Sequence, residues 1–241
     1  MEFLTSPAFW VALGQIVVID ILLGGDNAVV IALACRKLPP AQRTKGIVYG
    51  TMGAIVLRVI LIAFVMTLLN MPFLKFVGAL LLVWIGVKLI APEAEGHDNI
   101  ESSDRLWAAI KTIIVADLVM SVDNVIAIAG AAQHAGDHSL VLVVLGLLIS
   151  IPIIVWGSQL VIKLMARFPS IIVAGGMLLG WIAGSMLVTD PVLTNPTEWT
   201  WMPKVEQTGG VKYAAAAIGA LLVLAIGKYL AGKHSSPGAA A

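Results

Sequence analysis

Two long apolar segments of the chain carry the same pattern of acidic and amide side chains. Residues 18–34 read VIDILLGGDNAVVIALA, and residues 115–131 read VADLVMSVDNVIAIAGA. In each segment two aspartates lie six residues apart, and an asparagine follows the second aspartate. These residues are Asp20, Asp26, Asn27, Asp117, Asp123 and Asn124. Their oxygens are hard ligands that suit Ca²⁺, Mg²⁺ or Mn²⁺, so the pattern predicts a site for a divalent cation.

The composition places these acidic residues in a lipid bilayer. Of 241 residues, 59% are hydrophobic and only 12% are charged, and the mean hydropathy is +0.97. Soluble domains carry about 25% charged residues, so an ordinary soluble globule is excluded. A net charge of +1 gives no reason to expect a nucleic-acid partner. The single cysteine, Cys35, excludes an internal disulfide and a cysteine-rich metal site.

Seven apolar stretches are long enough to cross a bilayer, which takes about 20 residues. They are residues 8–34, 46–69, 73–91, 109–132, 139–163, 170–188 and 211–231. Since a backbone in hydrocarbon must satisfy its own hydrogen bonds, we predict an all-α polytopic membrane protein with seven transmembrane helices. Most of the 15 lysines and arginines fall on cytoplasmic segments if the N-terminus is outside, so we expect the C-terminus in the cytoplasm.

The pattern belongs to a longer internal repeat with an offset of 97 residues. Besides Asp20 and Asp117, the offset also matches Pro72 with Pro169 and Trp84 with Trp181. Each repeat holds three spans, an odd number, so the second repeat enters the membrane from the opposite side. This predicts two inverted three-helix repeats plus one C-terminal helix, with a substrate site near the midplane.

The repeat also gives a division of the chain into three parts of one membrane domain. Residues 1–107 form the first three-helix repeat with an acidic linker, and residues 108–188 form the second, inverted repeat. Residues 189–241 hold an extracytoplasmic loop, the seventh helix and a short tail.

Four aspartates inside spans need partners. On the insertion scale an aspartate at a helix centre costs about 2.5–3.5 kcal/mol. The inverted two-fold axis predicts that Asp20 lies level with Asp123, and Asp26 level with Asp117. If all four carboxylates bind the same ion directly, they must lie close to one another.

Two glycines between the aspartates of the first motif predict a break in that span. Gly24 and Gly25 can unwind the helix and expose carbonyl oxygens. The equivalent positions of the second motif are Ser121 and Val122, which predict a weaker break there.

Arg58 lies within the second span and has no counterpart in the repeat, where Val155 stands. A buried arginine needs a carboxylate, so Arg58 would neutralise an aspartate or act as a tethered counter-ion when no metal is bound. Alternatively, it extends to the membrane interface. Met120 in the second motif either packs against its neighbours or biases the site towards a softer ion such as Mn²⁺.

The motifs GGDNAVVIA at residues 24–32 and SVDNVIAIAG at residues 121–130 resemble those of the TerC family of integral membrane proteins, most closely its YjbE-like branch of metal transporters. The resemblance covers about residues 8–231. It implies seven transmembrane helices, a bacterial cytoplasmic-membrane location and, for several members, export of Mn²⁺. It also implies that the six motif residues given above are the ion ligands.

These observations together predict a secondary transporter that exports a divalent cation, most of all Mn²⁺, with Ca²⁺ as the other candidate. The direction of transport comes from the resemblance alone. The chain has no nucleotide motif of the P-loop type, so a primary pump is not expected, and neither enzymatic activity nor a resident cofactor is expected. Protons could occupy the carboxylates on the return stroke. The expected partners are the cation and the lipid bilayer.

Two other functions stay open. One is an exporter of small organic solutes or amino acids, which would need a site with apolar walls and fewer carboxylates. The other is a non-transporting membrane scaffold linked to metal or tellurite stress, in which the aspartates would be structural.

Overall fold

The computed structural model describes residues 7–64, 71–91, 102–133, 139–194, 201, 203, 205–206 and 208–234. Within these ranges the secondary structure is helical and contains no β-strand, as the predicted fold class requires. The helices are α1 (Pro7–Leu23), α2 (Gly25–Cys35), α3 (Pro40–Ala63), α5 (Leu74–Ile90), α6 (Ser102–Gln133), α7 (Ser139–Arg167), α8 (Ser170–Leu187), α9 (Pro191–Thr194) and α10 (Gly209–His234). Most of the predicted acidic linker lies outside the described residues.

Several helices are long and apolar enough to cross a membrane. Among the described residues they are Pro40–Ile62, Val141–Arg167, Ser170–Leu187 and Gly209–Lys233. The bent pair of α1 and α2 adds one more if it is counted as a single span. The protein is therefore a polytopic membrane protein with four or five candidate spans in the described part of the chain. Helices α5 and α6 lie in the remaining predicted segments, and the count of seven stays a prediction.

The predicted break in the first span is confirmed. Helix α1 ends at Leu23, α2 begins at Gly25, and the two helices are bent by 48°. The backbone N–H of Gly24 donates a hydrogen bond of 2.7 Å to the carbonyl oxygen of Asp20. A Cβ atom on Gly24 would overlap that oxygen, so this close approach requires a glycine.

The weaker break predicted at Ser121 and Val122 is wrong. Helix α6 continues without interruption through both residues. Neither residue lacks a Cβ or a backbone N–H, so both can continue a helix, and the Ser121 hydroxyl makes side-chain contacts described below.

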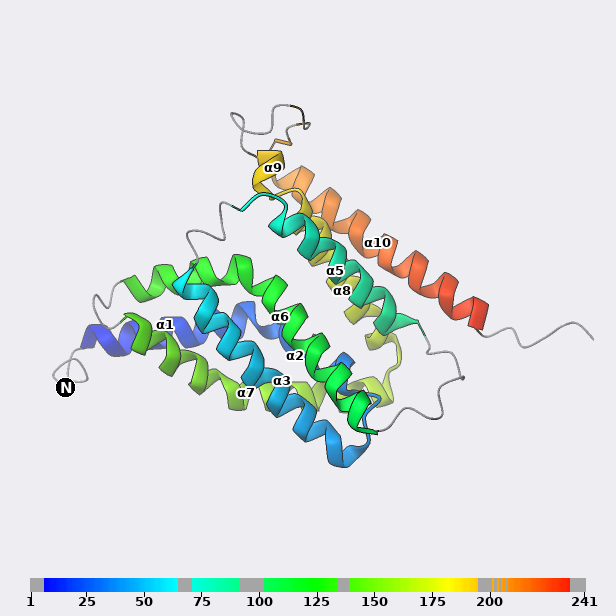
Figure 1. Ribbon diagram of the computed structural model, residues 1–241, viewed down its shortest axis with the longest axis horizontal. Helices are drawn as coiled ribbons and strands as arrows, with labels where there is room; N and C mark the ends of the chain where they lie inside the picture. The colour runs from blue at the N-terminus through cyan, green and yellow to red at the C-terminus, as the bar shows by residue number, and fades with distance from the viewer. Residues whose placement is uncertain are drawn as a thin grey trace, which may run out of the picture. The chain divides into compact units, whose positions relative to one another are not determined.

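The helices divide into two compact units (Figure 1). The first unit comprises residues 1–68 and 106–163 and holds α1, α2, α3 and most of α6 and α7. The second unit comprises residues 69–105 and 164–241 and holds α5, α8, α9 and α10. Each unit draws segments from both predicted repeats, and the predicted division into three parts stays a prediction.

In the second unit α8 packs against α5 and α10 through small residues (Figure 1). A Cβ atom on Gly180 or Gly184 would overlap backbone atoms of α10, and Gly86 of α5 lies against the backbone of Gly176. Glycines allow helix backbones to approach closely in a membrane, where van der Waals contact drives helix association.

Asp190 ties two helix starts of the second unit together. It is buried, and its carboxylate accepts hydrogen bonds from the backbone N–H groups of Phe73 (3.1 Å), Phe76 (3.0 Å) and Val192 (2.9 Å). The N-terminal N–H groups of a helix lack partners within the helix, so one side chain here satisfies donors of both α5 and α9.

Two apolar clusters form the core of the first unit. The first cluster consists of Phe9, Ala12, Leu13 and Ile16 of α1, Ile128 of α6, and Leu142, Val143 and Leu147 of α7. The second cluster consists of Ile31 and Cys35 of α2, Leu38, Ile47 of α3, Ala109 and Ile113 of α6, and Ile154 of α7. Along the chain, Asp20 and Asp26 fall between Ile16 of the first cluster and Ile31 of the second, and Asp117 falls between Ile113 of the second and Ile128 of the first.

Candidate ion-binding site

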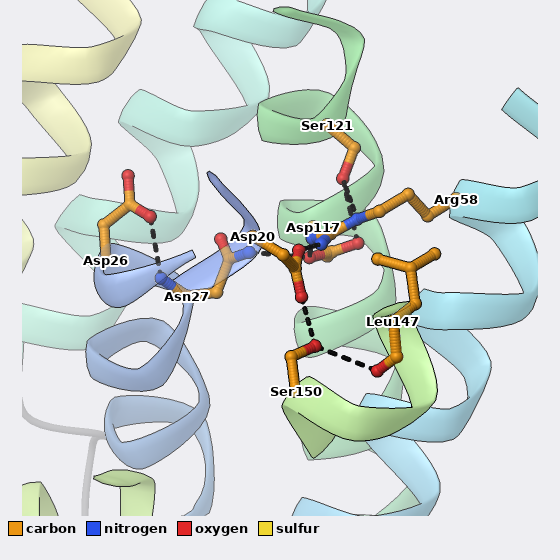
Figure 2. A network of polar contacts seen from close by, with 8 residues as sticks. All are labelled: Asp20, Asp26, Asn27, Arg58, Asp117, Ser121, Leu147 and Ser150. Carbon is orange, nitrogen blue, oxygen red and sulfur yellow. Dashed lines mark hydrogen bonds and ion pairs between the residues drawn. The ribbon is translucent and has the colours of Figure 1, made fainter. Parts of the chain in front are cut away.

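A buried arginine joins two of the predicted site residues. Arg58 of α3, which is only 3% exposed, makes ion pairs with Asp20 of α1 through Nη1 and with Asp117 of α6 through Nη2 (Figure 2). Its Nε donates a hydrogen bond of 3.0 Å to Oγ of Ser121. Arg58 therefore does not extend to a membrane interface. It pairs with two aspartates, whereas the sequence predicted that it neutralises one.

Asp117 is held by further side chains on both of its carboxylate oxygens. Oδ1 accepts a hydrogen bond of 2.9 Å from Nδ2 of Asn27, and Oδ2 accepts one of 3.0 Å from the hydroxyl of Ser121. Ser121 lies one turn after Asp117 on α6, so the two share a helix face. The Ser121 hydroxyl accepts from Arg58 and donates to Asp117, which satisfies its donor and an acceptor.

Asp20 has a further partner on a fifth helix, α7. The hydroxyl of Ser150 on α7 lies within hydrogen-bonding distance of Oδ2 of Asp20 and 2.9 Å from the carbonyl oxygen of Leu147. A hydroxyl has one proton, so it donates to one of these acceptors at a time. Helices α1, α2, α3, α6 and α7 thus all contribute to one connected group of buried polar side chains (Figure 2).

Asp26 does not join this group directly. Its Oδ1 accepts a hydrogen bond of 2.9 Å from the backbone N–H of Asn27, and its carboxylate lies apart from the side chains around Arg58 in Figure 2. The position in the first turn of α2 is favourable for a carboxylate, because helix N-termini carry a partial positive charge.

The remaining predicted ligands lie on α6. Asn124 is half-buried, and the side chain of Asp123 is outside the described residues. Among the residues that are described, no three histidine, cysteine, aspartate or glutamate side chains gather closely enough to hold a metal ion. Two of the carboxylates instead engage a guanidinium, and the convergence of all four aspartates stays a prediction.

Acidic side chains outnumber basic ones in this group. Asp20 and Asp117 both contact the one guanidinium of Arg58, and Asp26 immediately precedes Asn27, which bonds to Asp117, so in their ionised forms the three carboxylates would leave an excess of negative charge. Ionisable residues inside a membrane are costly and typically mark a substrate or ion pathway. A divalent cation would balance the excess negative charge, and the carboxylate oxygens are the ligands such an ion prefers.

Apolar residues bound the group along the helices that carry it. On α6, Asp117 lies between Ile113 of the second cluster and Ile128 of the first. On α7 the order along the chain is reversed, and Ser150 lies between Leu147 of the first cluster and Ile154 of the second. The polar group therefore has an apolar cluster on either side of it within the first unit.

Sequence reasoning did not assign Ser121 and Ser150 to the site. Asp117 and Ser121 are four residues apart, a spacing that places two side chains on one face of a helix, so the sequence contains a signal for Ser121. Ser150 is 130 residues from Asp20 in sequence, and no local pattern links the two.

Comparison with known proteins supports the resemblance seen in the motifs. A sequence profile described as "Integral membrane protein TerC family" matches residues 5–235. The uncharacterized membrane protein YjbE of Bacillus subtilis is 46% identical over 186 residues, which cover 77% of this chain and 83% of YjbE. The UPF0053 inner membrane protein YgdQ of Escherichia coli is 29% identical over 186 residues, which cover 70% of this chain and 76% of YgdQ.

A longer relative matches over only part of its length. The UPF0053 protein YegH of Escherichia coli is 27% identical over 192 residues, which cover 72% of this chain but 36% of YegH. No solved structure matches the chain.

Proposed function

The chain belongs to the TerC family of integral membrane proteins, and we propose that it is a secondary transporter, not an enzyme, that exports a divalent cation. Mn²⁺ is the foremost substrate and Ca²⁺ the alternative. The proposal places the protein in the cytoplasmic membrane with seven spans, the N-terminus outside and the C-terminus in the cytoplasm. Its ligands are drawn from Asp20, Asp26, Asn27, Asp117, Asp123 and Asn124.

The observation that carries this proposal is the shared use of Arg58. Asp20 and Asp117 occupy matching positions of the two repeats, and both contact the same buried guanidinium. A purely structural ion pair would need one carboxylate, and a second adds a negative charge that is costly to bury. In transporters with inverted repeats the substrate binds where the repeats meet, near the midplane.

Arg58 gives the carboxylates a cation when no metal ion is bound. In this mechanism the arriving ion takes a carboxylate from the guanidinium, and Arg58 takes it back when the ion leaves. Asp20 and Asp117 then always share at least one positive charge. Protons compete for the same oxygens, which provides a route for coupling export to proton return.

The two apolar clusters correspond to the two sides of the transport cycle. With the N-terminus outside, the first cluster lies towards the exterior and the second towards the cytoplasm. Alternating access requires that one of them opens while the other stays packed. The described arrangement, with both clusters packed around the polar group, fits a closed intermediate of such a cycle.

Ion flux in proteoliposomes tests the proposal. The purified chain would be reconstituted, and Mn²⁺ movement would be followed with a metal-sensitive dye. We expect Asp117→Asn to slow Mn²⁺ flux by about tenfold or more, since metal sites lose about 10- to 100-fold when even a supporting group is removed. Asp104→Asn is the matched control, because Asp104 is an exposed residue in the first turn of the same helix.

Two outcomes would contradict the proposal. Flux of the Asp117→Asn variant equal to that of the unaltered chain would exclude this carboxylate as a ligand. Absence of both Mn²⁺ and Ca²⁺ flux in the unaltered chain would favour a non-transporting scaffold.

A further inference from the structure

A small cavity lies beside Arg58 and Asp117 in the first unit. Asn27 of α2 and Thr51 of α3 contribute its other polar walls. Its apolar walls include Ile31, Ile113 and Ile154, which are members of the second cluster, so the cavity lies on that side of the polar group. Its volume of about 20 Å³ is enough for a water-sized particle.

Two oxygen atoms on this cavity have no hydrogen-bond partner among the described residues. They are Oδ1 of Asn27 and Oγ1 of Thr51, on side chains that are 4% and 3% exposed. The other end of the Asn27 amide, Nδ2, donates to Asp117, which fixes the orientation of the carbonyl oxygen. Buried polar atoms almost always have a partner, so two such oxygens on one cavity indicate a ligand that supplies it.

The helix register explains why Thr51 faces the same cavity as Arg58. Thr51, Ala54, Ile55 and Arg58 follow the spacing i, i+3, i+4 and i+7, and all four line the cavity. Ala54 lies between Thr51 and Arg58 in the sequence, and its side chain is a single methyl group. A long side chain on a helix leans towards the helix N-terminus, which for Arg58 is the direction of Thr51.

The oxygens identify the class of ligand. An amide carbonyl, a hydroxyl and the carboxylate of Asp117 surround the cavity, and all three are hard oxygen donors of the kind that bind Mn²⁺, Mg²⁺ or Ca²⁺. Asp20 does not line the cavity. An ion placed here would therefore compete with Arg58 for Asp117, while the guanidinium kept Asp20 and Ser121 as partners.

We propose that this cavity is a loading subsite for the transported divalent cation, in which Asn27 and Thr51 replace two waters of its hydration shell. Asp117 is the carboxylate that passes from Arg58 to the ion, and Asp20 stays with the arginine. Thr51 lies outside both sequence motifs, so it adds a neutral ligand from a third helix. This inference rests on the proposed function and names the place where the ion first meets the site.

The test is Mn²⁺ binding by the full chain in detergent, with manganese chloride as the probe and thermal denaturation as the readout. Thr51→Val removes the hydroxyl and keeps the shape of the side chain. We expect the Mn²⁺ concentration that gives a fixed rise in melting temperature to increase about tenfold, at the lower end of the range for altered metal sites. Without Mn²⁺ the melting temperature should stay the same or rise, because the hydroxyl has no partner to lose among the described residues.

Two further variants sharpen the comparison. Thr51→Ser keeps the hydroxyl and should bind Mn²⁺ like the unaltered chain. Thr112→Val makes the same chemical change on α6, where the hydroxyl donates to the carbonyl oxygen of Ala108 at 2.8 Å within its own helix. It should leave the Mn²⁺ concentration dependence unchanged.

The possible outcomes separate this inference from the proposed function. Unchanged Mn²⁺ binding by Thr51→Val, with binding lost in Asp117→Asn, would overturn the loading subsite and leave the transport proposal intact. A lower melting temperature of Thr51→Val in the absence of Mn²⁺ would show that the hydroxyl is structural, which would also overturn it. If the unaltered chain neither binds nor transports Mn²⁺ or Ca²⁺, the proposed function itself fails.

Discussion

Replacement of Arg58 by methionine should destabilise the protein strongly when no metal ion is present. The guanidinium contacts Asp20, Asp117 and Ser121, and all of these side chains are buried. Removing one partner of a buried ion pair costs about 3–5 kcal/mol, because the other charge stays buried without compensation. For a chain of this size each kcal/mol lowers the melting temperature by about 2–4 °C, so we expect a fall on the order of 10 °C.

Mn²⁺ should reverse much of this loss. In the unaltered chain the ion competes with Arg58 for a carboxylate, whereas in Arg58→Met it binds without that competitor. A ligand that binds only the folded state stabilises it in proportion to the logarithm of its concentration over the dissociation constant. The increase in melting temperature at a fixed Mn²⁺ concentration should therefore be larger for Arg58→Met than for the unaltered chain.

The control is the double variant Arg58→Met with Asp117→Asn. It buries one negative charge fewer, so it should be more stable than Arg58→Met without Mn²⁺ and should gain less from the ion. The reasoning is refuted if Arg58→Met melts at the same temperature as the unaltered chain without Mn²⁺. It is also refuted if Mn²⁺ raises both melting temperatures equally, because the arginine and the ion would then not share a carboxylate.

Two further substitutions test the structural framework of the site. Asp190→Ala removes the acceptor for three backbone N–H groups at the starts of α5 and α9, and should lower stability by about 2 kcal/mol, the upper range for one lost cap. Chemical or thermal denaturation would measure this loss, and unchanged stability would exclude the capping role. Gly24→Ala places a Cβ atom against the Asp20 carbonyl oxygen and should reduce both stability and Mn²⁺ flux, whereas Gly25→Ala meets no atom within 4 Å and should be tolerated. Equal effects of the two glycine substitutions would show that the turn does not depend on the close approach at Gly24.

Local sequence signals predicted the elements that carry the site. The glycine pair predicted the break between α1 and α2, because the tight turn at Gly24 has no room for a Cβ atom. The break predicted in the second motif does not form. Serine disfavours a helix when its hydroxyl bonds to nearby backbone groups in place of the helical hydrogen bonds. In the structure that hydroxyl bonds to Asp117 and Arg58, and α6 stays continuous.

The partners within the polar group depend on how distant helices pack, which the local pattern does not encode. Arg58 lies 38 residues from Asp20 and 59 from Asp117, and it has no counterpart in the repeat to suggest where its side chain points. No sequence motif marks Thr51, and only the cavity beside it distinguishes it from other residues of α3. The repeat matches Asp20 with Asp117 in sequence, but its inverted axis predicted that Asp26 lies level with Asp117. The structure instead brings Asp20 and Asp117 together at Arg58.

Equilibrium binding of radioactive Mn²⁺ to the purified chain tests the central claim most directly, because it detects the ion at the site without requiring a transport cycle. The unaltered chain and Asp104→Asn should bind Mn²⁺ saturably, and Asp117→Asn should lose this binding. Saturable binding that persists in Asp117→Asn, or no binding by the unaltered chain, would contradict the claim that Arg58 and a divalent cation exchange at Asp117.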